Sequence, residues 1–75
     1  MLYTHHQAEE STPEGKRLPT VAELQSMTGL DPEQAYWSSE TCDFNGTEGA
    51  MCVQGTGDAF CNSLGSVLPV VYVDV

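Results

Sequence analysis

Basic residues are almost missing from this chain. Of its 75 residues only two are Lys or Arg, against 11 Asp and Glu, which gives a formal net charge of −9. The two basic residues, Lys16 and Arg17, are adjacent, so an extensive internal network of ion pairs is excluded. Such a charge repels nucleic acid and anionic membrane surfaces. We therefore expect no nucleic-acid partner, and a ligand that is basic, cationic or mostly apolar.

Long apolar runs and targeting signals are lacking too. The longest hydrophobic stretch, residues 67–73, is interrupted by Pro69 and is far too short to cross a bilayer. The first ten residues contain neither the basic nor the apolar region of a signal peptide. We therefore expect no membrane insertion, and a chain that is either intracellular or a mature piece of a larger protein.

Cysteine is scarce, and its spacing argues against a metal site. The three cysteines are separated by ten and nine residues, without a C-x-x-C pair (Cys42, Cys52 and Cys61). A zinc site with four ligands would need a histidine from the far end of the chain, His5 or His6. One disulfide and one free thiol are therefore expected, which favours an oxidising compartment.

A helix is the clearest element that the sequence predicts. Thr20 and Glu23 have the spacing of a capping box, in which each side chain binds the other residue's backbone N–H. Apolar residues follow at helical spacing, and Gly29 stands where a glycine commonly ends a helix. We expect a helix of two to three turns that begins after Thr20. Residues 1–14, by contrast, are expected to form a short strand followed by an exposed loop.

The last third of the chain is typical of β structure. Residues 50–54 and 59–63 flank Gly-Thr-Gly-Asp, a natural hairpin loop. A four-residue loop would place Cys52 opposite Cys61, within reach of a disulfide. We prefer this pairing, while Cys42–Cys52 and Cys42–Cys61 remain open because connectivity does not follow from sequence.

Two further segments complete the expected sheet. Residues 42–49 read as a loop with a turn at Asn45-Gly46. Residues 67–75 are apolar on both faces of a strand, which predicts a well-covered strand. Trp37, the only tryptophan, is expected in the core.

Three segments together resemble a known family. Residues 15–24, GKRLPTVAEL, resemble the W-R-L-P-T-x-x-E-L segment of the bacterial C-type-lectin-like domains that end invasin- and intimin-type adhesins. Residues 36–40, YWSSE, and the closing 70–75, VVYVDV, are similar to later blocks of those domains. Lys16 and Asp74 depart from the family's Trp and Cys, and the segment between the first blocks is short. The chain would thus be a minimal or diverged version.

The resemblance implies the fold class and the domain organisation. It implies an α+β fold, a small C-type-lectin-like domain with one short helix, an antiparallel sheet and long loops. This lectin-like region would cover residues 15–75 of a single small domain spanning residues 1–75. The family binds surface ligands, often proteins, without guaranteed sugar binding.

Candidate site residues are few. Asp43, Asn45 and Glu48 share one loop and form a weak calcium candidate, against which an Asx-turn is favoured. Asn45-Gly46-Thr47 is also a glycosylation sequon, relevant in a eukaryotic secretory setting. No residues have the pattern of a catalytic set. The candidate binding anchors are aromatic residues: Tyr36, Phe44 and Phe60.

We therefore expect a non-catalytic binding domain without a cofactor. It would recognise a protein or glycan ligand as part of a bacterial or phage surface or adhesin protein, at an extracellular, cell-surface or virion-surface location. The alternative is a small acidic cytoplasmic inhibitor that mimics the charge of nucleic acid and blocks a basic groove on a target enzyme. A formed disulfide favours the first hypothesis, and three free thiols favour the second.

Overall fold

The computed structural model describes residues 2–75, so residue 1 of the predicted first segment lies outside it. The described chain has an α+β architecture of two short helices and two antiparallel sheets, and strands predominate. The elements in chain order are α1 (His5–Glu10), β1 (Lys16–Arg17), α2 (Val21–Ser26), β2 (Ala35–Phe44), β3 (Thr47–Gln54), β4 (Ala59–Ser63) and β5 (Val73–Asp74). The main sheet has the order β2-β3-β4, and β1 pairs with β5.

Both helices begin with a capping box. Thr20 and Glu23 exchange their hydrogen bonds as predicted, although α2 ends at Ser26, sooner than expected. Thr4 and Gln7 make the same pair of contacts at the start of α1. Residues 5–10 therefore form a helix in place of the predicted strand and the first part of the loop, because the capped turn at Thr4 starts a helix there. Residues 11–14 lie outside helices and strands and are mostly exposed, as predicted for the loop.

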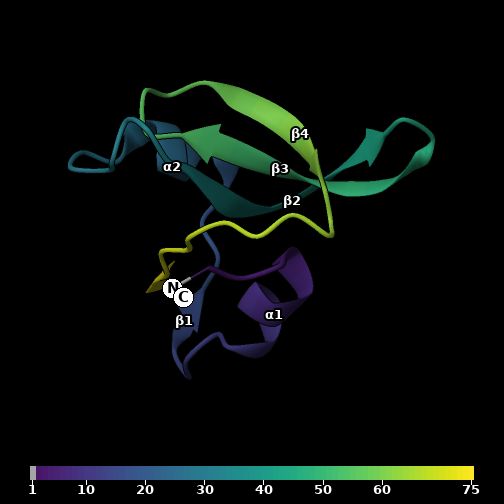
Figure 1. Ribbon diagram of the computed structural model, residues 1–75. Helices are drawn as coiled ribbons and strands as arrows, with labels where there is room; N and C mark the ends of the chain where they lie inside the picture. Colours follow the sequence, from purple (N-terminus) through teal and green to yellow (C-terminus); the bar gives the residue numbers. More distant parts are fainter. Residues whose placement is uncertain (1) are drawn as a thin grey trace.

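The β2–β3 hairpin turns at Asn45-Gly46, where the sequence predicted a turn. Both residues have positive φ, 51° and 85°, as two-residue hairpin turns commonly require. The prediction of a loop over residues 42–49 is wrong, because β2 runs to Phe44 and β3 starts at Thr47. Figure 1 shows the tip of this hairpin projecting from the rest of the molecule.

The β3–β4 hairpin differs from the predicted register by one residue. Cys52 lies opposite Phe60, and Cys61 lies opposite Met51. The loop between the last pair, Val53 and Ala59, therefore has five residues where four were expected. A shift of one residue moves every side chain to the other face of the strand.

The register of the β3–β4 hairpin determines which cysteines form the disulfide. The predicted Cys52–Cys61 bridge is wrong: Cys61 is bonded to Cys42, and Cys52 is free and buried. Cys42 and Cys61 belong to β2 and β4, the two strands on either side of β3, yet their Cα atoms are only 6.0 Å apart. The bridge therefore crosses β3, and it does so beside Gly49, where a Cβ atom would lie 3.4 Å from the Cys61 sulfur.

The main sheet is covered on both faces. One core cluster contains Trp37 and Cys52, together with Ala8, Leu18 and Ala50. The other cluster consists of Leu24, Tyr36 and Val53. Figure 1 shows α1, β1 and the C-terminal segment grouped on one side of the sheet, with α2 near one end of its strands. Trp37 is fully buried, as predicted, and its Nε1 donates to the Tyr3 carbonyl at 2.8 Å.

The C-terminal segment is mostly extended without being a strand. Only Val73–Asp74 forms a strand, paired with β1, and Leu68 makes an isolated bridge with Tyr3, so the predicted strand over residues 67–75 is wrong. Its alternation is nevertheless realised, because Leu68, Val70 and Tyr72 pack on the Trp37 cluster and Val71 on the Leu24 cluster.

Among the described helices, none has the length and hydropathy needed to span a membrane.

Candidate functional site

The three predicted aromatic anchors do not form one surface. Tyr36 is only 8% exposed, and its hydroxyl accepts a hydrogen bond from the Asp31 backbone N–H at 3.1 Å. Phe44 is partly buried, whereas Phe60 is 37% exposed. Phe60 pairs with Cys52, so it lies on the face of the sheet opposite to Tyr36. Tyr36 therefore serves the core, and the two phenylalanines stay separate candidates.

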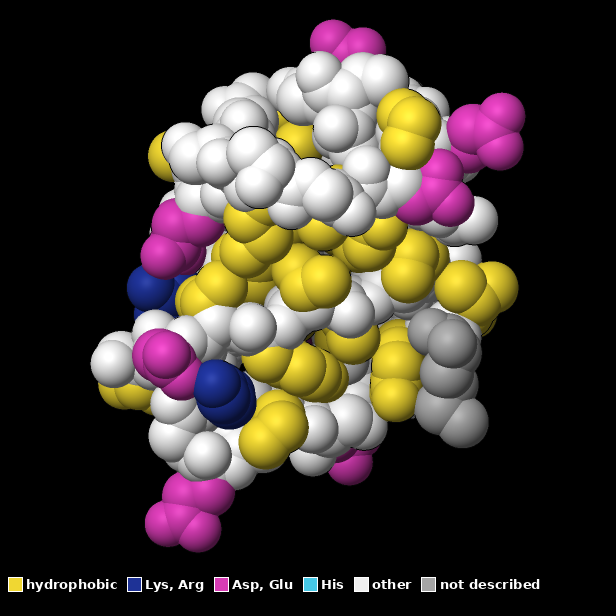
Figure 2. Space-filling model, turned by 90° about the vertical axis from the view of Figure 1, so that its left-hand side faces the viewer, with side chains coloured by type: hydrophobic (Ala, Val, Ile, Leu, Met, Phe, Trp, Pro, Cys, Tyr) yellow, Lys and Arg dark blue, Asp and Glu magenta, His cyan; other side chains and the backbone are white. Residues whose placement is uncertain are grey.

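A hydrophobic surface lies elsewhere, along the side that carries α2 and the end of the chain. Figure 2 shows hydrophobic side chains gathered in a band across the middle of this side. Four partly buried residues pack around the Leu24 cluster, and we call them the apolar face: Val21, Met27, Leu30 and Val71. Val21 and Met27 are among the apolar residues at helical spacing after Thr20, a pattern that indicates the buried side of a helix and does not show that these two side chains stay partly exposed.

The two basic residues are both held by carboxylates beside this band. Lys16 Nζ contacts Asp74 Oδ1. Arg17 makes a bidentate pair with Glu23, with nitrogen–oxygen distances of 2.6 and 2.7 Å. The Arg17 guanidinium, together with the Thr20 backbone N–H, lowers the pKa of Glu23 from 4.5 to about 2. Because both cations are used internally, the net charge of −9 falls on carboxylates that no Lys or Arg neutralises.

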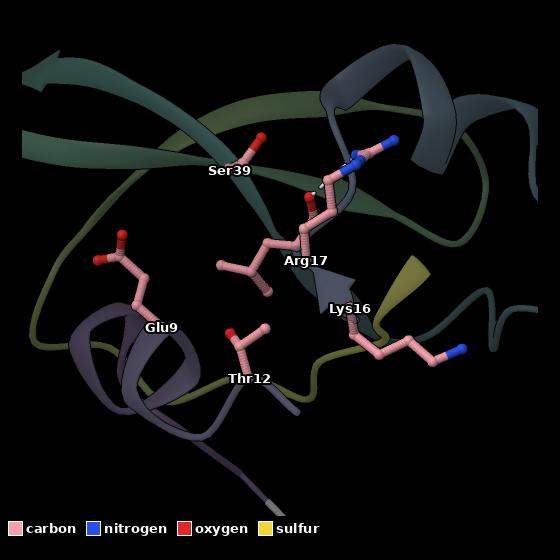
Figure 3. Close-up of a pocket in the computed structure, with 6 residues that line it drawn as sticks. Glu9, Thr12, Lys16, Arg17 and Ser39 are labelled. Carbon is pink, nitrogen blue, oxygen red and sulfur yellow. Dashed lines mark hydrogen bonds between the residues drawn. The ribbon is translucent and has the colours of Figure 1, made fainter. Parts of the chain in front are cut away.

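A shallow hollow of about 250 Å³ lies between α1, β1 and β2. Its lining residues are Glu9, Thr12, Lys16, Arg17, Leu18 and Ser39. Figure 3 shows the charged ends of Lys16 and Arg17 directed away from Glu9. The hollow thus has one carboxylate, two hydroxyl groups and an apolar leucine, without an inward cation.

His5, which lies in the segment predicted as a strand and loop, is a buried polar residue of α1. Its Nε2 lies 2.9 Å from the Ser38 carbonyl and therefore donates to it, since a carbonyl only accepts. Its Nδ1 lies 3.3 Å from Glu9 Oε1, and its ring meets Trp37 edge-on. These contacts fasten α1 to β2. The capping box at Thr4 is the signal that would have placed His5 and Glu9 on one helix face.

The weak calcium candidate forms a turn. Asp43 Oδ1 accepts a hydrogen bond from the Gly46 N–H at 3.1 Å, and Glu48 lies opposite Asp43 across the hairpin. Asn45 occupies the positive-φ corner between them. Within residues 2–75, no three His, Cys, Asp or Glu side chains are grouped so as to hold a metal ion.

Comparisons with protein-family models, with curated proteins and with solved structures find no match to this chain. Function is therefore inferred from the residues of the chain itself.

Proposed function

We propose that this chain is a non-catalytic binding domain that recognises a protein or glycan at a surface, within a bacterial or phage surface or adhesin protein of the C-type-lectin-like type. The apolar face is the observation that carries this proposal. Hydrophobic side chains gathered at the surface of a small domain commonly mark an interaction site. Here they lie on an otherwise strongly acidic molecule with a net charge of −9. Most of its other surface groups are polar and prefer contact with water.

The disulfide supports the proposed location. A bond between Cys42 and Cys61 suits an extracellular, cell-surface or virion-surface protein, because cytosolic thiols are generally kept reduced. The alternative, a cytoplasmic inhibitor, would be expected to keep three free thiols.

The charge suggests how a partner is approached. Carboxylates surrounding an apolar centre steer a partner with a basic rim, whereas the apolar contacts at the centre determine how long the complex lasts. Leu30 and Met27 are suited to such a centre, because each side chain is only partly covered by the Leu24 cluster. A nucleic-acid mimic would instead depend on many carboxylates at once.

Salt dependence distinguishes the two functions. Raising the salt concentration from about 0.1 M to about 1 M shortens the Debye length from about 10 Å to about 3 Å. In pull-downs from host surface extract and from lysate, we expect the surface partner to be retained at high salt. Recovery of basic nucleic-acid-handling proteins alone, lost at high salt, would refute the adhesin proposal in favour of the acidic inhibitor.

A matched pair of variants locates the contact. Leu30→Ser removes part of the apolar face, whereas Val67→Ser alters a side chain that is 50% exposed and lies outside that face. Capture should be lost with Leu30→Ser and kept with Val67→Ser, while circular dichroism shows that both variants fold. Equal capture by both variants would exclude the apolar face as the binding surface.

A further inference from the structure

We infer that Asn45 is a deamidation site whose rate is restrained by Asp43. Asn45 and Gly46 form the exposed turn of the β2–β3 hairpin, which projects from the molecule (Figure 1). Asn45 has a φ of 51°, the one positive value among the described residues other than glycine. An asparagine followed by glycine is the sequence in which a backbone nitrogen most readily reaches a side-chain amide, because glycine has no side chain to obstruct the approach.

The reaction needs only water as co-reactant. The Gly46 backbone nitrogen loses its proton to solvent, and its electron pair then forms a bond to Asn45 Cγ. The bond from Cγ to the side-chain nitrogen breaks, and that nitrogen takes up a proton and leaves as ammonia. Water next hydrolyses either carbonyl of the five-membered succinimide, which gives aspartate or isoaspartate. One water is consumed and one ammonia released, without a change in oxidation state.

Asp43 acts on the first step. Its Oδ1 accepts the hydrogen bond of the same Gly46 N–H that must lose its proton, at 3.1 Å. A carboxylate at this position opposes the reaction twice, because it holds the proton and because its charge disfavours a second anion beside it. The hydrogen bond also holds the Gly46 N–H within the turn, so it must break before the nitrogen can react.

The product changes the molecule locally and in total charge. Conversion to aspartate or isoaspartate adds one negative charge, from −9 to −10. The new carboxylate stands in a turn already flanked by Asp43 and Glu48. Isoaspartate also lengthens the backbone by one atom at a turn whose two residues set the register of β2 against β3.

The test follows the conversion of Asn45 in three versions of the full-length oxidised chain. Wild type, Asp43→Asn and Asp43→Ala are incubated at mildly alkaline pH, and peptide mapping by mass spectrometry counts aspartate and isoaspartate at each asparagine. Asp43→Asn keeps a hydrogen-bond acceptor without its charge, so it should react faster than wild type and slower than Asp43→Ala. We expect Asp43→Ala to react faster than wild type by a factor on the order of five, the effect of losing one exposed charged hydrogen bond.

Three controls keep the inference falsifiable. Asn45→Gln should show no conversion at position 45, and Asn62, whose Oδ1 accepts from the Ser63 N–H, should remain unchanged in every version. Wild type unfolded in urea with its disulfide intact gives the unrestrained rate and should also exceed the folded rate, even if a variant fails to fold. Equal rates in folded wild type and Asp43→Ala, or preferential conversion of Asn62, would overturn the inference.

Discussion

Glu23 is the residue at which the contacts around the start of α2 converge. Its carboxylate binds the Arg17 guanidinium and the Thr20 N–H, which lower its pKa from 4.5 to about 2. Because the pKa is lower in the folded state, the stabilisation is complete above about pH 4.5 and is lost as the pH falls toward 2. Glu23→Gln should therefore be less stable than wild type at neutral pH, with the difference vanishing at the acidic limit. Urea unfolding at a series of pH values checks this, and a difference independent of pH would contradict it.

The threonine caps show what local sequence can predict. Thr20→Ala should lower the free energy of unfolding by about 0.5–2 kcal/mol, because the Glu23 N–H loses its acceptor. Thr4→Ala, which removes the equivalent acceptor of the Gln7 N–H, should cost a similar amount. Thermal melts of both variants check this prediction, and an unchanged melt of Thr20→Ala would count against the helix start.

The two caps were not equally visible in the sequence. Apolar residues at helical spacing follow Thr20, so the capping box there was recognised. After Thr4 come mostly polar residues, and α1 is buried through His5 and Ala8 alone. A helix that contacts the core through so few residues carries little periodic signal, so only the spacing of Thr4 and Gln7 predicts it.

Gly49 is the feature of β3 that the disulfide requires. A Cβ atom there would lie 2.5 Å from the Asn62 carbonyl oxygen and 2.9 Å from Phe44 Cβ. Gly49→Ala should therefore separate β2 from β4 and destabilise the domain by about 1–3 kcal/mol. Gly65→Ala is the matched control, because its Cβ would meet nothing closer than the Ser63 hydroxyl at 3.8 Å.

Thiol titration and thermal melting read out both glycine variants. Gly49→Ala should melt at a lower temperature and bury less of its disulfide, so that mild reductant opens Cys42–Cys61 sooner than in wild type. Gly65→Ala should behave as wild type. Wild-type behaviour of Gly49→Ala would mean that β3 does not pass so close to its neighbours.

The hairpins mark the limit of prediction at the scale of elements. Turn residues predicted both turns, at Asn45-Gly46 and at the glycine-rich segment before Ala59. Four- and five-residue loops, however, are both compatible with Gly-Thr-Gly-Asp, and their difference reverses which face each cysteine occupies. The register is set by burial of Cys52 and Val53 on opposite faces, which depends on the rest of the fold.

The whole molecule explains why the apolar end of the chain is not a long strand. Residues 67–72 lie along the Trp37 cluster and cover it with alternate side chains, while their backbone pairs only at the Tyr3–Leu68 bridge. Alternation predicted the faces correctly, because it reports burial. A strand also needs the free edge of another strand to pair with, and the local sequence pattern does not predict whether such an edge is nearby.

The stability of the whole domain depends on the Cys42–Cys61 disulfide. A core built by 75 residues commonly supplies only a few kcal/mol of net stability. The disulfide between Cys42 and Cys61, which are 19 residues apart, lowers the conformational entropy of the unfolded chain. This raises the free energy of unfolding by about 3 kcal/mol. Reduction should therefore remove most of the stability, as measured by urea unfolding with and without reductant.

In the oxidised native chain Cys52 should resist alkylation, because burial excludes reagents and raises the pKa of its thiol to about 11.

The Cys42→Ser/Cys61→Ser variant provides the control for that experiment. It should unfold like the reduced wild type and should not respond to reductant, since Cys52 is then the only thiol. Non-reducing peptide mapping of the wild type should find Cys42 linked to Cys61. A bridge that includes Cys52, or equal stability of the oxidised and reduced chains, would mean that β2 and β4 are not joined across β3. The main sheet would then lack a covalent link between its two outer strands, each of which pairs with β3 and not with the other.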